Sequence, residues 1–161
     1  MDILTALSAK YLYLASILLG LLIVFLTKGK RLPTLKLALI SLPLALFLGK
    51  LANRFIQNPR PFAIKNIQPL IPHAPDNGFP SDHTLLVATI AAIVFAYDKK
   101  WGIVLSILAL LVGASRVFAQ VHNWLDIAGS FVIAFTAVYI SRFLLNYLRA
   151  GQTPKASEIK S

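Results

Sequence analysis

The chain has 161 residues, of which 57% are hydrophobic and only 14% charged, with a net charge of +10 and no cysteine. Soluble domains carry about 25% charged residues, so this composition excludes an ordinary soluble domain and indicates one integral membrane domain. The missing cysteines exclude disulfides and thiolate sites, and the positive charge is attributed to the ends of membrane helices, because no basic stretch is interleaved with aromatic residues as nucleic-acid binding would require.

Apolar segments follow one another along the whole chain, and a bilayer core needs about 20 apolar residues in a helix. Five segments are predicted to be helical, at about 11–26 (with 3–26 as an alternative), 35–56, 84–97, 101–118 and 124–147. The first is too long for the apolar part of a signal peptide, so it is expected to be a retained span. Pro43 is expected to kink the second. The third would be only about 21 Å long, which fits a helix that starts in a pocket below the membrane surface.

Basic residues collect on alternate connections between these segments. They are Lys28, Lys30 and Arg31, then Lys99 and Lys100, and finally Arg149, Lys155 and Lys160. The positive-inside rule places all three groups in the cytoplasm, and therefore places the N-terminus and the connections 57–82 and 116–123 outside. Residues 1–150 are expected to form a single membrane-embedded domain, and 151–161 a polar cytoplasmic tail.

Three polar stretches interrupt the apolar sequence, and all three lie on the connections predicted to face outward. They read NPRPF at 58–62, FPSDH at 79–83 and SRVFAQVHNWLD at 115–126. Together they supply guanidinium groups, imidazoles, a hydroxyl and a carboxylate, which are the groups that phosphate-ester chemistry needs. The sequence therefore predicts a phosphate-handling site assembled from separate helix ends.

The third stretch places His122 and Asp126 four residues apart, on one face of a helix start. A carboxylate one turn from an imidazole can accept Nδ1–H, fix the tautomer and leave Nε2 free to attack. The alternative is a polar pair that only caps the fifth helix. We favour the catalytic interpretation, because an ionisable group within a span is usually functional.

The other two stretches make weaker signals when each is taken alone. Ser81 precedes an apolar run and is a natural N-cap, so the start of that helix would be an anion site with His83 in its first turn. An ordinary capped helix is the alternative. Pro59 and Pro61 favour an extended segment that would hold Arg60 at the membrane surface, although an isolated RP pair is common.

Taken in order, RP, PSxH and SRx5HxxxD resemble the signature of the type 2 phosphatidic acid phosphatase superfamily and its bacterial lipid phosphatases. The resemblance implies that His122 is the nucleophile that forms a phosphohistidine and that Asp126 supports it. It implies that His83 is the general acid and then the base that activates water. It also implies that Arg60, Arg116 and Ser81 bind the phosphate, with no metal or other cofactor.

The sequence departs from the family pattern at Asn53, which occupies the position of the usual Lys. Lys50 and Arg54 share a helical face with Asn53, so either could replace that Lys as a phosphate-binding residue, and Arg54 is preferred by proximity. Asp at position 82, where the family more often has Gly, and the stretch LIPHAPDNG at 70–78 resemble the undecaprenyl-diphosphatase branch. His73 in this stretch could contact a second phosphate, but a surface-loop histidine is the favoured interpretation.

The predicted fold is all-α, a multi-pass transmembrane bundle of five helices, with six as an alternative. The predicted protein is a bacterial cytoplasmic-membrane phosphatase that removes the terminal phosphate of undecaprenyl diphosphate at the outer face. Its expected partners are the lipid substrate and the bilayer, and no nucleic acid. The alternatives are a lipid A 1-phosphatase or a phosphatidylglycerophosphatase of the same superfamily. An enzyme with broad specificity for lipid phosphates is a further alternative. A non-catalytic lipid-binding membrane protein is the alternative from another class.

Overall fold

The computed structural model describes residues 2–27 and 29–150, and this part of the chain is helical with no β-strand. Its helices are α1 (Asp2–Leu26), α2 (Arg31–Phe55), α3 (Pro61–Lys65), α4 (Asp82–Phe95), α5 (Lys99–Phe118) and α6 (Trp124–Ala150). By length and composition α1, α2, α5 and α6 can each cross a membrane. The predicted all-α, multi-pass membrane bundle is confirmed with its five predicted helices, and the sixth helix, α3, is a five-residue helix in the connection between α2 and α4. Lys28 and residues 151–161 lie outside the described residues.

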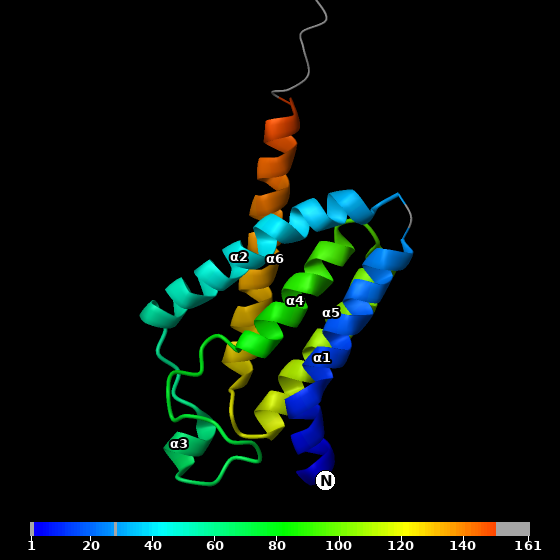
Figure 1. Ribbon diagram of the computed structural model, residues 1–161. Coiled ribbons are helices and arrows are strands. Elements are labelled where there is room, and N and C mark those ends of the chain that lie inside the picture. The colour runs from blue at the N-terminus through cyan, green and yellow to red at the C-terminus, as the bar shows by residue number, and fades with distance from the viewer. Residues whose placement is uncertain (1, 28, 151–161) are drawn as a thin grey trace, which may run out of the picture.

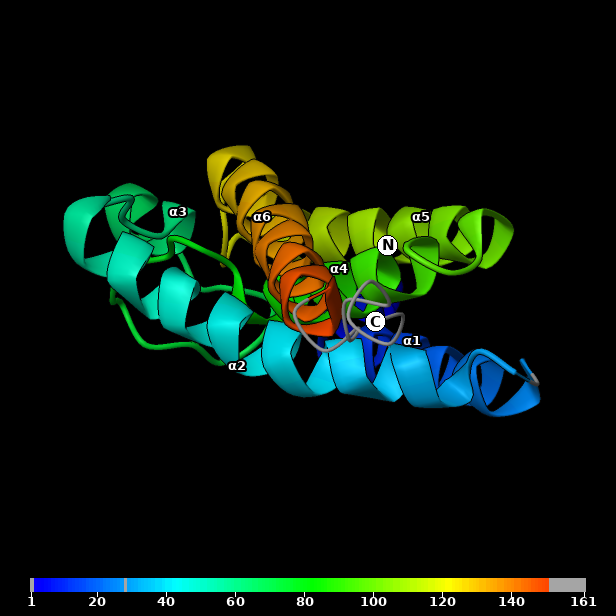
Figure 2. The ribbon, with the colours of Figure 1, turned by 90° about the horizontal axis from the view of Figure 1, so that it is seen from above.

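The short helix α4 is the centre of the bundle. It packs against α1, α2, α5 and α6, and nine of its 14 residues are buried. Seen from above, α4 lies between α2 and α5 (Figure 2). In Figure 1 its first turn begins higher in the bundle than the lower ends of α1 and α5. The large apolar side chains of the outer helices face away from this core, for example Leu39, Phe47 and Phe143. Such surfaces suit contact with lipid tails.

Helix boundaries differ from the prediction in ways that have local causes. α1 begins at Asp2, which supports the longer of the two predicted starts. α2 continues through Pro43. α5 begins at Lys99 because Asp98 caps it, accepting a hydrogen bond from the Trp101 backbone N–H at 3.2 Å. α3 was not predicted: the extended backbone expected around Arg60 ends there, and Pro61 starts a short helix at its first position.

The connections fall into two groups at opposite ends of the bundle. In Figure 1 the N-terminal end, α3, and the loops before α4 and after α5 lie at the lower end. The α1–α2 and α4–α5 connections lie at the upper end, with the last turns of α6. All three polar stretches of the sequence therefore lie at one end, and the basic connections lie at the other.

Candidate active site

The long connection between α2 and α4 is fixed to the bundle by one asparagine. The Asn77 side chain donates to the backbone oxygens of Asn53 and Ile56, both at 2.8 Å, and accepts from the backbone N–H of Asn58 at 2.9 Å. Pro59 and Asn77 form an isolated antiparallel bridge. The segment that carries Arg60 is therefore held beside the segment that leads into α4.

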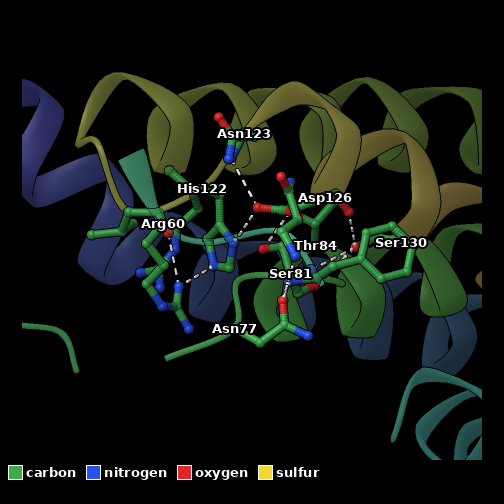
Figure 3. A network of polar contacts seen from close by, with 12 residues as sticks. Arg60, Asn77, Ser81, Thr84, His122, Asn123, Asp126 and Ser130 are labelled. Atoms are coloured by element: carbon green, nitrogen blue, oxygen red, sulfur yellow. Dashed lines mark hydrogen bonds and ion pairs between the residues drawn. The ribbon is translucent and has the colours of Figure 1, made fainter. Parts of the chain in front are cut away.

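His122 is the centre of the polar network, in the turn between α5 and α6, and only 2% of it is exposed. In Figure 3 its ring lies between Asp126 and Arg60. Nδ1 lies 3.1 Å from Asp126 Oδ2, and Nε2 lies 3.2 Å from Arg60 Nη1. Since a guanidinium only donates, Nε2 must be the acceptor and Nδ1 must carry the proton. The predicted His–Asp pair is formed with the expected tautomer, although Nε2 faces Arg60 in this state.

Asp126, in the first turn of α6, is fully buried and uses both carboxylate oxygens. Besides His122, Oδ2 accepts from the Asn123 backbone N–H at 2.8 Å. Oδ1 accepts from the Asn58 side-chain amide at 2.7 Å. Three donors therefore converge on one carboxylate, which fits an ionised group that orients the imidazole. A cap of the helix alone would not need the partners from residues 58 and 122.

Arg60 is the extended residue directly before α3, and it is buried. Its Nε donates to Asp76 Oδ1 at 2.7 Å, and its Nη1 donates to the Val121 backbone oxygen at 2.8 Å as well as to His122. The sequence placed Arg60 at the membrane surface on an extended segment. The structure places it under the connection, in direct contact with the predicted nucleophile.

Arg116, in the last turn of α5, is the second buried guanidinium. Its Nη1 donates to the Ala9 backbone oxygen at 3.1 Å, and its Nη2 donates to His73 Nε2 at 2.7 Å. Its Nε is buried and has no hydrogen-bond partner among the described residues. An unpaired buried donor is costly, by about 1–3 kcal/mol, so a hydrogen-bond acceptor at this atom would stabilise the protein. Ser115 beside it donates to the Val112 backbone oxygen.

His73 is not the surface-loop histidine that the sequence favoured. It is partly buried, it accepts the hydrogen bond from Arg116, and its ring centre lies 6.1 Å from that of His122. His83, in the first turn of α4, packs edge-on against the Tyr13 ring at 4.3 Å. It lies within electrostatic range of Arg116, His122 and His73. The structure therefore brings all three histidines of the chain to one end of the bundle.

Ser81 occupies the predicted N-cap position of α4, but its side chain makes no capping hydrogen bond. It is fully buried, and its Oγ accepts from Thr84 at 3.1 Å. Its backbone N–H donates to Ser130 Oγ at 3.0 Å, so this N–H is already satisfied. The N–H of this N-cap residue is therefore bonded to α6, while the anion site expected from the first N–H groups of α4 itself stays a prediction.

Lys50 and Arg54 are exposed at the end of α2 and line a cavity of about 380 Å³ together with Arg60, Asp76 and Asp82. The two cations thus share a cavity with a buried arginine of the site. Asn53, at the position of the usual Lys, donates to the Phe79 backbone oxygen at 2.6 Å. Its side chain ties α2 to the stretch before α4 and does not act as a cation.

The pKa of His73 is lowered to about 4, mainly because the ring is partly buried, and the positive charges of Arg60 and Arg116 act in the same direction. Burial also lowers the pKa of His122 below 6.5, against the opposing hydrogen bond to Asp126. The hydrogen bond from Arg60 lowers the pKa of Asp76. At neutral pH both imidazoles are therefore neutral, as their contacts with arginine donors require.

The neutral state of His73 can be checked directly, since the chain has only three histidines. We expect its ring resonances in isotope-labelled protein to titrate with a midpoint near pH 4, because burial and neighbouring cations disfavour the imidazolium. The resonance is assigned from its absence in a His73→Gln variant. A midpoint near the ordinary value of about 6.5 would contradict the observed environment.

Several residues of the network were not predicted from the sequence, among them three of the long connection. Asn58 and Asp76 contact Asp126 and Arg60, and Gly78 lets the connection pass close to the carboxylate. A Cβ at Gly78 would lie 2.9 Å from Asp126 Oδ2 and 3.1 Å from the Asn58 backbone oxygen. The only sequence signal was the position of Asn58 beside Pro59 and of Asp76 in LIPHAPDNG. Neither position shows which distant residue it meets.

The sequence is similar to those of several known proteins. The bacitracin transport permease protein BcrC of Bacillus licheniformis is 37% identical over 125 residues, covering 76% of this chain and 62% of that protein. The undecaprenyl-diphosphatase BcrC of Bacillus subtilis is 42% identical over 76 residues, covering 47% of this chain and 39% of that protein. The undecaprenyl-diphosphatase of Sulfolobus acidocaldarius is 33% identical over 104 residues, covering 63% of this chain and 50% of that protein.

The chain spans less than two thirds of the length of the curated relatives it matches. No solved structure matches it. The family model of the PAP2 superfamily matches residues 34–149, which include most of α2, all of α3, α4 and α5, nearly all of α6 and every polar stretch of the site. This match covers more than half of the chain, and the chain therefore belongs to the PAP2 superfamily.

Proposed function

We propose that this protein is an integral membrane lipid phosphatase that removes the terminal phosphate of undecaprenyl diphosphate through a phosphohistidine. The observation that carries the proposal is the position of His122. Its Nδ1 faces a carboxylate that is fully hydrogen-bonded, and its Nε2 lone pair faces the Arg60 guanidinium. A neutral imidazole with this tautomer, next to a group that binds phosphate, is poised for nucleophilic attack on phosphorus.

The first step transfers the phosphoryl group to the protein. A phosphate oxygen takes the place of His122 Nε2 as the acceptor for Arg60, and Arg116 binds a second oxygen through its unpaired Nε. The Nε2 lone pair attacks phosphorus, and the P–O bond to the lipid breaks. The leaving oxygen takes a proton from His83, whose imidazolium form is favoured by the bound phosphate. The arginines offset the charge that develops on the phosphoryl oxygens.

The second step regenerates the site. A water molecule attacks the phosphorus of the phosphohistidine and gives its proton to His83. The P–N bond breaks, and its electron pair returns to His122 Nε2. The products are inorganic phosphate and a lipid with one phosphate fewer. Asp126 keeps the proton of His122 on Nδ1 in both steps.

The choice of substrate rests on two of the three relatives above, which are named as undecaprenyl-diphosphatases. Lys50 and Arg54 line a cavity that also reaches Arg60, and this supports a substrate with more than one phosphate. Lipid A 1-phosphate and phosphatidylglycerophosphate are the other substrates to compare. A non-catalytic lipid-binding protein would be expected to lose one of His83, Arg116 or His122, and the chain has all three.

The test is phosphate release by purified protein from a panel of prenyl diphosphates, lipid A and glycerophospholipid phosphates. We expect the highest kcat/KM with long prenyl diphosphates. A higher kcat/KM with lipid A or phosphatidylglycerophosphate would show that the preferred substrate is that lipid, while the proposed phosphatase chemistry would stand. No release from any member of the panel would reject the hydrolase proposal.

Activity should survive treatment with EDTA, because arginines are assigned the charge neutralisation that a divalent ion provides in other phosphatases. Within residues 2–27 and 29–150 no three His, Asp or Glu side chains gather as a metal site would require. The measurement is phosphate release before and after chelation, with added Mg²⁺ as the control. Loss of activity that Mg²⁺ restores would contradict the assignment.

We propose that the site faces outward from the cytoplasmic membrane, because the basic connections lie at the opposite end of the bundle. A cysteine at Ala74, which is exposed on the long connection, should react with a membrane-impermeant thiol reagent in spheroplasts. One at Lys100 should react only after lysis. The chain has no native cysteine, so the background is low. Labelling of position 100 and not of position 74 in intact spheroplasts would show that the site faces the cytoplasm and would contradict the proposed topology.

A further inference from the structure

The tetrapeptide HAPD at residues 73–76 contacts both buried arginines of the site, one from each end. His73 Nε2 accepts from Arg116 Nη2 at 2.7 Å, and Asp76 Oδ1 accepts from Arg60 Nε at 2.7 Å. The two arginines come from different elements, the end of α5 and the start of α3. No other short segment of the described residues is seen to bond to both guanidinium groups.

The remaining contacts of each arginine follow the same scheme. One Nη1 donates to a backbone oxygen, that of Val121 for Arg60 and that of Ala9 for Arg116. With a backbone oxygen on one side and a loop side chain on the other, each guanidinium is fixed in its plane. Arg116 keeps Nε without a partner among the described residues, and Arg60 keeps Nη2. Each therefore has N–H donors left for a phosphoryl oxygen.

The tetrapeptide is itself held on both sides. Before it, Ile71 is buried in a cluster with Phe62 and Val121, and the Leu70 backbone N–H donates to the Ala119 backbone oxygen at 3.3 Å. After it, the Asn77 side chain bonds to the end of α2. A segment anchored at both ends can hold an arginine in place, and a mobile lid could not.

The charges of the two ends also suit this role. The low pKa of His73 keeps its ring neutral at neutral pH, so it accepts from Arg116 without adding a positive charge next to His122. Asp76 is a carboxylate whose side chain is 64% exposed. It can therefore orient Arg60 while water screens much of its negative charge from the phosphate.

We infer that residues 73–76 are a positioning clamp, in which His73 orients Arg116 and Asp76 orients Arg60 so that each arginine presents its remaining N–H donors to the phosphoryl group. The inference rests on the proposed function in that the bound group is a phosphoryl group. It adds two positioning residues outside the three polar stretches. Neither residue needs to contact the substrate.

The first experiment measures orthovanadate binding by calorimetry on the purified full-length protein, together with kcat and KM for phosphate release. In His73→Ala and in Asp76→Ala we expect vanadate to bind about tenfold more weakly or worse, because each loses a hydrogen bond to a charged group. We expect kcat to fall while KM for the lipid changes little. His73→Gln and Asp76→Asn keep an acceptor atom and should recover most of the affinity. Ala74→Ser, an exposed position between the two, is the matched control and should bind vanadate as the wild type does.

The second experiment tests which arginine each residue serves. In an Arg116→Lys background, His73→Ala should have little further effect on vanadate affinity, whereas in Arg60→Lys it should keep its full effect. Asp76→Ala should show the reverse pattern. If His73→Ala does not fold, His73→Met replaces it, because Met fills the volume and is only a weak acceptor.

Several results would overturn the clamp. These are a wild type that does not bind vanadate, alanine variants that bind it as the wild type does, acceptor variants as weak as the alanine variants, or equal losses in both arginine backgrounds. Failure of the clamp and failure of the proposed function are distinguishable. An active wild type with unaffected variants rejects only the clamp, and a wild type that binds vanadate but releases no phosphate from any lipid rejects the hydrolase.

Discussion

Replacement of His122 by alanine should abolish phosphate release while the protein still inserts and folds. If Nε2 is the atom that attacks phosphorus, no other group can take its place, because His73 is bonded to Arg116 and His83 packs on Tyr13. Loss of a covalent nucleophile in a catalytic triad lowers kcat by about 10⁶-fold, and a loss of similar size is expected here. The measurement is phosphate release from the best substrate of the panel.

The fold should survive this change, because Asp126 keeps two of its three donors, Asn58 and the Asn123 backbone N–H. The lost hydrogen bond costs about 1–3 kcal/mol, which thermal unfolding in detergent can detect. His73→Gln is the control: it also removes one histidine of the site but keeps an acceptor for Arg116, so it should retain most of the activity. Phosphate release by His122→Ala at a rate near that of the wild type would rule out His122 as the nucleophile.

Sequence patterns predicted the architecture well because a membrane restricts the length and the composition of the helices that cross it. A span needs a long apolar run, so the four long helices could be read from hydropathy, and α4 stood out because it is short. The His122–Asp126 pair was also local information, since residues four apart share a helix face. Both predictions needed only neighbouring residues.

Contacts between distant loops could not be predicted in the same way. The long connection brings Asn58 to Asp126 and Asp76 to Arg60, and it buries His73 against Arg116. Each contact depends on how residues 56–81 fold over the end of the bundle, which has no periodic pattern. For the same reason the sequence favoured a surface position for His73.

Tertiary partners decide the roles of two polar side chains near the start of α4. Ser81 lies at the N-cap position, but Ser130 of α6 already accepts from its N–H, and its hydroxyl bonds to Thr84. Asn53 departs from the family pattern because it supports the backbone before α4. In both cases the polar side chain helps to hold one helix end against another. Helix propensity and capping preference depend only on neighbouring residues, so they could not predict this.

Replacement of Asp126 by asparagine should lower kcat by about 10⁴-fold, the loss caused by the same change in the serine-protease triad. The carboxylate accepts from His122 and the Asn123 N–H on one oxygen and from the Asn58 amide on the other. An asparagine has one oxygen and one NH2 group, so with the Asn58 amide in its present orientation a donor meets a donor whichever way the new side chain turns. If its NH2 group turns to His122, Nδ1 must accept and the proton moves to Nε2, which would block the nucleophile and oppose Arg60.

The double variant Asp126→Asn with Asn58→Asp is the matched control, because it keeps the same kinds of group and the same total charge. The carboxylate introduced at position 58 would accept from the NH2 group of the new asparagine and turn the asparagine oxygen towards His122, so the proton returns to Nδ1. We therefore expect the double variant to recover at least about tenfold of the activity lost by Asp126→Asn, since each 1.4 kcal/mol of restored interaction is worth about that factor. The tautomer can be checked independently from the ¹⁵N shifts of His122. A single variant with normal activity, or a double variant with the Nδ1 proton restored and no gain in rate, would show that Asp126 does not act through the tautomer of His122.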